Sequence, residues 1–94
     1  MVRRLIIKCR VMKTPKSCIL FVLDKDLHFS LEAGRYYEVE IKRNDETYTL
    51  RLVFVRFQGF WVHPDLCNNI LNFEDGEEIE VDLKGRVHML GEIG

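Results

Sequence analysis

The chain has 94 residues, of which 47% are hydrophobic and 31% are charged, and its formal net charge is −1. This composition is typical of one ordinary globular domain and excludes an intrinsically disordered chain. Its longest apolar run, CILFVL, is too short to span a membrane. Only three apolar residues follow the basic start, which is too few for a signal peptide. We therefore expect a cytoplasmic protein without membrane contact.

Positive charge is concentrated at the start of the chain. Residues 1–16 carry a charge of +6 and contain no acid, whereas the remaining residues carry −7. Such an asymmetry can indicate an edge that binds a polyanion. The alternative is an ordinary solvated strand whose cations pair with acids elsewhere in the chain. The six candidate nucleic-acid-binding residues are Arg3, Arg4, Lys8, Arg10, Lys13 and Lys16.

Most of the chain alternates between apolar and polar residues. In the first segment, Ile7 and Cys9 share one face, and Lys8 and Arg10 share the other. A period of two with charge on one side predicts half-buried antiparallel strands, and Pro, Gly, Asn and Asp mark the turns between them. The predicted strands are 3–13, 17–23, 35–43, 47–57, 60–63, 77–83 and 86–90.

The segment HPDLCNNILNF has a helical pattern instead. Pro64 suits the first position of a helix and Asp65 suits its first turn, so we predict a helix over 64–72. His63, Asp65 and Cys67 lie within five positions here, as a reactive cluster or metal site would require. However, residues two apart on a helix do not face each other, and zinc needs about four ligands. We therefore interpret these residues as a helix start and a buried thiol.

The stretch YTLRLVFVRFQGFW is apolar on both faces. A small barrel buries only one face of each strand, so the second face must be covered by the helix, by another subunit or by a partner. Aromatic residues beside arginine are common in interface hot spots and in platforms that stack single-stranded nucleic acid. The candidate partner-binding residues are Arg51, Val53, Val55, Arg56, Phe57, Phe60 and Trp61.

Two stretches 42 residues apart are related, SLEAGRYYEVEIK and NFEDGEEIEVDLK. Gly34 matches Gly76 and Val39 matches Val81, and each stretch follows two predicted strands. A unit of strand, strand, short helix or loop, glycine turn and strand thus occurs twice. Two such units interlocked about a pseudo-twofold axis can close a barrel, which removes exposed strand edges. We expect a single domain over 1–94, with pseudo-repeats at about 3–43 and 47–90.

The pattern FEDGEEIEV resembles the GD box of the cradle-loop β-barrels, a group that includes the AbrB-like swapped-hairpin, RIFT and double-psi barrels. The strand, proline-started helix, glycine turn and strand of the second repeat look most like the AbrB half-barrel. The first repeat departs from the box because Arg35 takes the acidic position. The resemblance implies a mostly β fold: a small closed pseudo-twofold barrel with one short α-helix. AbrB-like chains usually carry one unit and dimerise, whereas this chain carries two.

None of the GxGxxG, Walker, HExxH or GxSxG motifs occurs, so we expect no enzyme activity, catalytic residue, metal or cofactor. The resemblance favours a non-catalytic, nucleic-acid-associated binding module: a DNA-binding barrel, or a small accessory subunit of a replication or transcription assembly. We expect a monomer or homodimer and a larger protein partner, such as a polymerase or another assembly. One alternative is a protein–protein adaptor without nucleic-acid contact, and another is a small enzyme that uses the cradle loops.

Overall fold

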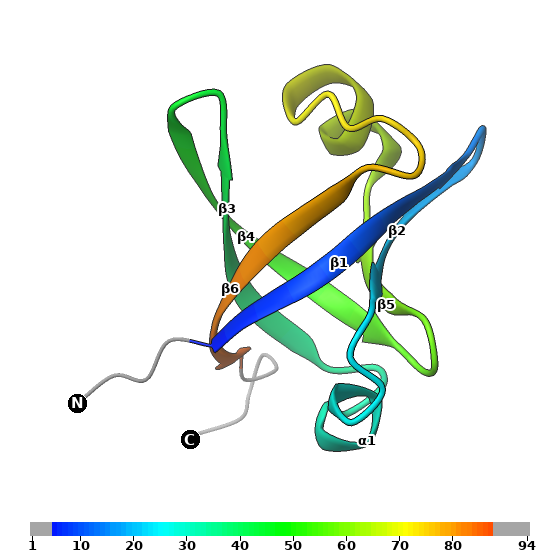
Figure 1. The fold of residues 1–94 in the computed structure, drawn as a ribbon, viewed down its shortest axis with the longest axis vertical. Helices are drawn as coiled ribbons and strands as arrows, with labels where there is room; N and C mark the ends of the chain where they lie inside the picture. The colour runs from blue at the N-terminus through cyan, green and yellow to red at the C-terminus, as the bar shows by residue number, and fades with distance from the viewer. Residues whose placement is uncertain (1–4, 88–94) are drawn as a thin grey trace.

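A computed structural model describes residues 5–87, which form six strands and two short helices. All neighbouring strands are antiparallel, and they follow the order β1-β2-β5-β4-β3-β6, with β6 pairing back to β1 to close the barrel (Figure 1). The mostly β closed barrel predicted from the sequence is therefore confirmed. The strands are β1 (Leu5–Thr14), β2 (Ser17–Val22), β3 (Tyr36–Arg43), β4 (Glu46–Val55), β5 (Gly59–Val62) and β6 (Glu78–Val87).

The core follows from the alternation of the strands. In β1, Ile7, Cys9 and Val11 are buried, whereas Lys8 and Arg10 between them are exposed. Equivalent inward-facing residues of the other strands fill the centre of the barrel, and none of the buried side chains among the described residues is polar or charged. The interior is thus a packed apolar core, not a channel.

The two halves of the barrel interlock through their glycine turns. The N–H of Gly76 donates to the carbonyl of Val11 at 2.7 Å, and the N–H of Gly34 donates to the carbonyl of Phe54 at 2.8 Å. Each glycine therefore binds the first strand of the opposite half. Both have a positive φ, +85° and +80° respectively, which is the conformation that favours glycine. The strand order also stays the same when β1, β2 and β3 are exchanged with β4, β5 and β6, as two interlocked units require.

Two short helices lie at opposite ends of the barrel, α1 (Leu27–Ser30) and the π-helix η1 (Leu66–Ile70) (Figure 1). The helix predicted over 64–72 is thus shorter than expected and mostly of the π type, since the N–H of Leu71 donates to the carbonyl of Leu66 at 2.8 Å. The wide turn lets Cys67 and Leu71 both reach the core. Neither helix is long and apolar enough to cross a membrane.

The last two predicted strands are one continuous strand, β6. Its pairing with β3 skips Lys84, which is an extra residue in a β-bulge. The sequence KGR therefore marks a bulge and not the turn that we predicted, because glycine is common in both. The predicted residues 88–90 lie outside the described part of the chain.

Candidate protein-binding surface

Three neighbouring strands, β2, β5 and β4, place apolar side chains on the outside of the barrel. Ile19, Trp61 and Val53 are direct partners across these strands, and all three are half-buried. The residues next to them in the chain, such as Leu20 and Phe60, are fully buried. Because successive side chains of a strand point to opposite faces, Ile19, Trp61 and Val53 point away from the core.

This row extends to the strands on either side. Met12 of β1 pairs with Ile19, and Tyr36 of β3 pairs with Val53. Met12 is 50% exposed and Tyr36 is 43% exposed. Neighbouring strands lie about 4.8 Å apart, so the row covers about 19 Å of the barrel surface. We call the row the apolar belt; its members are Met12, Ile19, Trp61, Val53 and Tyr36.

A second apolar row lies two residues further along the strands. It contains Phe21 of β2 and Val55 of β4, which both pair with Gly59 of β5. A Cβ atom on Gly59 would lie 1.9 Å from the carbonyl oxygen of Leu20, so only glycine fits. The close approach of β5 to β2 thus depends on this glycine. This close approach keeps the two apolar rows on one surface.

Neither helix within residues 5–87 packs over the apolar belt, although the ring of His63 meets the ring of Trp61 edge-on, with centroids 5.8 Å apart. The partly buried apolar residues that pack on the core, among them Leu27 of α1 and Leu66 of η1, include no member of the belt. Both short helices lie at the ends of the barrel and not over its side (Figure 1). Of the three coverings considered from the sequence, the helix of the same chain does not fill this role.

Most of the candidate partner-binding residues lie on or next to this surface. Four are on the outer face of β4 and β5, and two are in the turn that joins these strands. The four are Arg51, Val53, Val55 and Trp61, and the two in the turn are Arg56 and Phe57. Neither Arg51 nor Arg56 forms an ion pair with any described residue.

Phe60 does not belong to this surface. It is completely buried, and its ring meets the rings of Phe54 and Tyr37 edge-on, with centroids 5.6 and 6.1 Å apart. Its neighbour Trp61 faces outwards, so strand alternation requires Phe60 to face inwards. Phe60 is therefore a core residue and not a partner-binding residue.

Sequence reasoning misses the contributions of β1, β2 and β3 to this surface, namely Met12, Ile19, Phe21 and Tyr36. A signal exists for Ile19 and Phe21, because CILFVL is apolar on both faces, as the strand 47–57 is. The pairing that joins these residues to Trp61 cannot be deduced from either strand alone.

The basic first strand does not form a continuous positive surface. Lys8 and Arg10 are exposed, but they lie opposite Glu80 and Glu78 of β6. The guanidinium of Arg10 forms an ion pair with Glu78 at 2.8 Å. Cations and acids therefore alternate on this face of the barrel.

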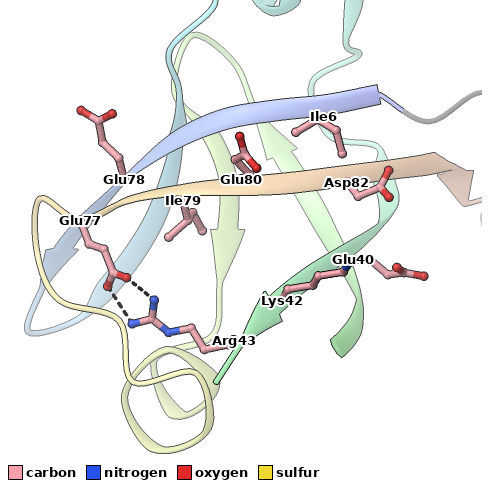
Figure 2. A pocket seen from close by; sticks show the side chains of 9 residues that line it. All are labelled: Ile6, Glu40, Lys42, Arg43, Glu77, Glu78, Ile79, Glu80 and Asp82. Carbon is pink, nitrogen blue, oxygen red and sulfur yellow. Dashed lines mark hydrogen bonds and ion pairs between the residues drawn. The ribbon is translucent and has the colours of Figure 1, made fainter. Parts of the chain in front are cut away.

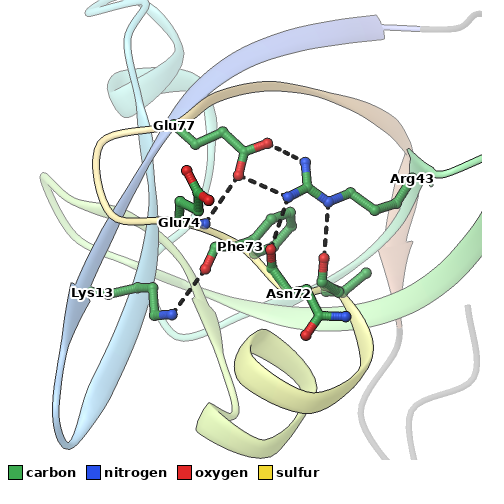
Figure 3. Close-up of polar contacts among 7 residues, drawn as sticks. Lys13, Arg43, Asn72, Phe73, Glu74 and Glu77 are labelled. Carbon is green, nitrogen blue, oxygen red and sulfur yellow. Dashed lines mark hydrogen bonds and ion pairs between the residues drawn. The ribbon is translucent and has the colours of Figure 1, made fainter.

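Of the other four basic candidates, only Lys13 and Lys16 lie within the described residues. Arg3 and Arg4 lie outside the described residues. Lys13 is half-buried, and its ammonium donates to the carbonyl of Phe73 at 2.8 Å, so it holds the loop before β6 (Figure 3). Lys16 is exposed in the turn between β1 and β2.

Strands β3 and β6 add more acid to the same side of the molecule. Glu78, Glu80 and Asp82 follow one another along β6 and line a depression of about 360 Å³ (Figure 2). Lys84 partly neutralises it, because its ammonium lies 3.4 Å from Glu40 and 3.5 Å from Asp82. Within residues 5–87 no group of three or more His, Cys, Asp or Glu residues is arranged to hold a metal ion.

Arg43 holds the loop between η1 and β6. Its guanidinium donates to the carbonyls of Leu71 and Asn72 at 2.8 and 2.9 Å, and it forms a two-point ion pair with Glu77 (Figure 3). It also lies over the ring of Phe73, 4.9 Å from the centroid. Its hydrogen bond lowers the pKa of Glu77, and burial opposes this only in part. This network is structural, since it satisfies carbonyls that the end of the helix leaves free.

His63, Asp65 and Cys67 do not form a reactive cluster. The thiol of Cys67 is fully buried, whereas the side chains of His63 and Asp65 are exposed, with 3.7 Å between Nδ1 and Oδ2. The N–H of Asp65 donates to Nδ1 of His63 at 3.1 Å, which ties the ring to the start of the helix. The interpretation as a helix start and a buried thiol is confirmed.

No protein-family model matches the chain, and comparison with curated proteins and with solved structures gives no match. The candidate surface must therefore be interpreted from its own geometry.

Proposed function

We propose that the protein is a non-catalytic binding module that docks a protein partner on the apolar belt. The observation that carries this proposal is the row Ile19–Trp61–Val53, which is apolar, points outwards, crosses three strands and lies under neither described helix (Figure 1). Tryptophan is among the residues most enriched in interface hot spots, and Trp61 lies at the centre of this row.

The closed barrel restricts how such a partner binds. Each of the six described strands pairs on both sides, so there is no free edge to which a partner could add a strand. Docking must therefore use side chains on the outer face. Arg51, which forms no ion pair with a described residue, suits the polar rim that surrounds the apolar centre of most interfaces.

Nucleic-acid binding is the less favoured hypothesis. Phosphate contacts require clustered cations, and the acids of β6 lie between the cations of β1 and the rest of that face. A DNA-binding barrel or a replication or transcription subunit remains a prediction that salt-dependent binding would test. The protein-adaptor hypothesis leads because the apolar belt continues across five neighbouring strands, whereas Lys8 and Arg10 lie opposite acids of β6.

We also infer that the barrel is of the cradle-loop type. Two observations support this: the halves exchange hydrogen bonds at Gly34 and Gly76, and the strand order is unchanged when the halves are exchanged. The GD-box resemblance of the second half agrees with both. A solved structure of this chain that superposes its halves by a twofold rotation would test the assignment.

Photo-crosslinking in the source cell tests the binding proposal. A benzoylphenylalanine residue would replace Val53 in the belt and, as the matched control, Thr47, which is exposed on the same face of the same strand. We expect a single strong adduct with another protein from position 53 and none from position 47. The adduct should survive nuclease treatment.

Three results would overturn the proposal. Equal adducts from both positions would mean non-specific contact. An adduct with a second copy of this chain would make the belt a homodimer interface. Loss of the adduct with nuclease, together with a DNA or RNA shift at about 50 mM salt, would favour the nucleic-acid hypothesis.

A further inference from the structure

A groove at one end of the barrel, separate from the apolar belt, contains the two most exposed aromatic side chains of the described residues. It lies between α1 and the turn that joins β4 to β5, and its volume is about 420 Å³. Phe29 of α1 is 81% exposed and Phe57 of the turn is 63% exposed, and both line the groove. Large apolar side chains this exposed often mark a binding site.

Phe57 has an unfavourable backbone conformation. Its φ is +60°, and the other non-glycine residues with positive φ among the described residues are Asn44, Asp45 and Asn72, types that tolerate this conformation. A bulky residue there is strained. A neighbouring strand holds the turn in place, because the N–H of Val22 in β2 donates to the carbonyl of Gln58 at 3.0 Å. Because the ring is mostly exposed, burial of Phe57 in this chain does not account for an aromatic residue at this position.

Arg56 provides the polar part of the groove. It is exposed, lines the groove, and forms no ion pair with a described residue. The acid that also lines the groove, Glu32, already interacts with Arg35 at 3.2 Å. Arg56 therefore offers its charge to a ligand, and a carboxylate matches the geometry of a guanidinium.

We propose that this groove binds a short peptide segment of a partner that presents a bulky apolar side chain next to a carboxylate. The side chain would insert between Phe29 and Phe57, and the carboxylate would pair with Arg56. A nucleic-acid strand fits less well, because tracking its backbone requires several cations, and the described residues that line the groove include one arginine, which has no ion pair with a described residue. This site does not depend on the belt, so the failure of either proposal leaves the other untouched.

The test is a titration of the full chain, labelled with ¹⁵N, followed by the shifts of its backbone amides. The probes are N-acetylphenylalanine, which carries a carboxylate, and N-acetylphenylalaninamide, which does not. We expect millimolar binding that shifts the amides of Ala33, Gly34, Phe57 and Gln58. The carboxylate should bind about two- to fivefold more tightly than the amide, the range of an exposed ion pair.

Two variants separate recognition from structure. Arg56→Gln should remove the preference for the carboxylate and leave the affinity for the amide unchanged. Phe57→Asn should abolish binding of both probes while the melting temperature stays the same or rises, because asparagine tolerates the positive φ. Val53→Glu in the belt should leave both affinities unchanged.

Any of four results would overturn the proposal. The first is that the amide shifts lie elsewhere or are absent, and the second is that the two probes bind with equal affinity. The third is a Phe57→Asn protein that melts several degrees lower than wild type. The fourth is that oligothymidylate binds the groove more tightly than N-acetylphenylalanine does. The melting result would assign Phe57 a structural role, and the last result would assign the groove to nucleic acid.

Discussion

At the scale of single residues, Gly59 and Gly76 are required for different physical reasons. The Cα of Gly59 faces the backbone of β2, and a Cβ atom there would lie 1.9 Å from the carbonyl oxygen of Leu20. Gly76 has open space around it, with no atom within 4 Å of a Cβ, but its φ of +85° disfavours any other residue. Gly59 is needed because no side chain fits there, and Gly76 is needed because of its positive φ.

This difference predicts how substitutions behave. Gly76→Ala should lower the free energy of unfolding by about 1–2 kcal/mol, and Gly76→Asn by less, since asparagine tolerates positive φ. Gly59→Ala should cost about 3 kcal/mol or more, because overpacking forces β5 away from β2. Gly59→Asn should be worse still. Denaturant unfolding of the four variants checks the prediction, and a Gly59→Ala protein as stable as wild type would contradict it.

The ion pair between Arg43 and Glu77 predicts a pH dependence. The hydrogen bond from Arg43 lowers the pKa of Glu77 below its unfolded value, so this carboxylate stabilises the fold above that value. The contribution is lost as the pH falls through the folded pKa. Glu77→Gln should therefore destabilise the protein by about 1–3 kcal/mol at neutral pH, and the difference should shrink below about pH 4.

The control for this prediction is Glu78→Gln, since Glu78 pairs with Arg10 on the exposed surface, where ion pairs contribute about 0–1 kcal/mol. Urea unfolding at several pH values measures both variants. If Glu77→Gln lost the same stability at pH 3 as at pH 7, the carboxylate would not be the group that stabilises this loop.

At the scale of the elements, alternation predicts which residues of each strand face the core, but not which strands meet. Ile19 and Trp61 become neighbours only through the pairing of β2 with β5, and this pairing is not encoded in either strand. The length of the β4–β5 turn likewise decides that Phe60 faces inwards. The belt therefore becomes visible only once the barrel closes.

The short helix η1 likewise depends on contacts that its own sequence does not predict. Pro64 and Asp65 predict where a helix starts, and that prediction is confirmed. Its π geometry depends on the core positions of Cys67 and Leu71 and on Arg43, which reaches the carbonyl of Leu71 from 28 residues away. No local pattern could have predicted that contact.

The burial of the three thiols predicts how they react with a reagent in solution, and this reactivity reports whether the strands and η1 open locally. Burial raises the pKa of Cys9 and of Cys18 to about 12, and Cys67 is completely buried. Because the thiolate is the reactive form, the native protein should not react with Ellman's reagent at pH 8, whereas the unfolded chain should release three equivalents. A cysteine introduced at Thr47 should react at once. Rapid native labelling of Cys67 alone would show that η1 opens locally and would revive a reactive role for it.

At the scale of the whole molecule, the closed barrel separates two surfaces of different character. The side formed by β1, β3 and β6 carries alternating cations and acids, with Lys8 and Arg10 facing Glu80 and Glu78. The side formed by β2, β5 and β4 carries the centre of the apolar belt, which continues to Met12 of β1 and Tyr36 of β3. Closure leaves none of the six described strands with a free edge for association, so the proposed function depends on the belt.

The most direct test of that account is the affinity of the crosslinked partner, once purified, for two single-site variants of this protein, measured by calorimetry. Val53→Glu places a charge in the belt next to Trp61, and Thr47→Glu places the same charge on the same strand outside the belt. We predict that Val53→Glu weakens binding at least about 30-fold, equivalent to 2 kcal/mol at a hot spot, and that Thr47→Glu changes it less than about twofold. Equal affinities of the two folded variants for the partner would contradict the claim that the apolar belt is the docking surface.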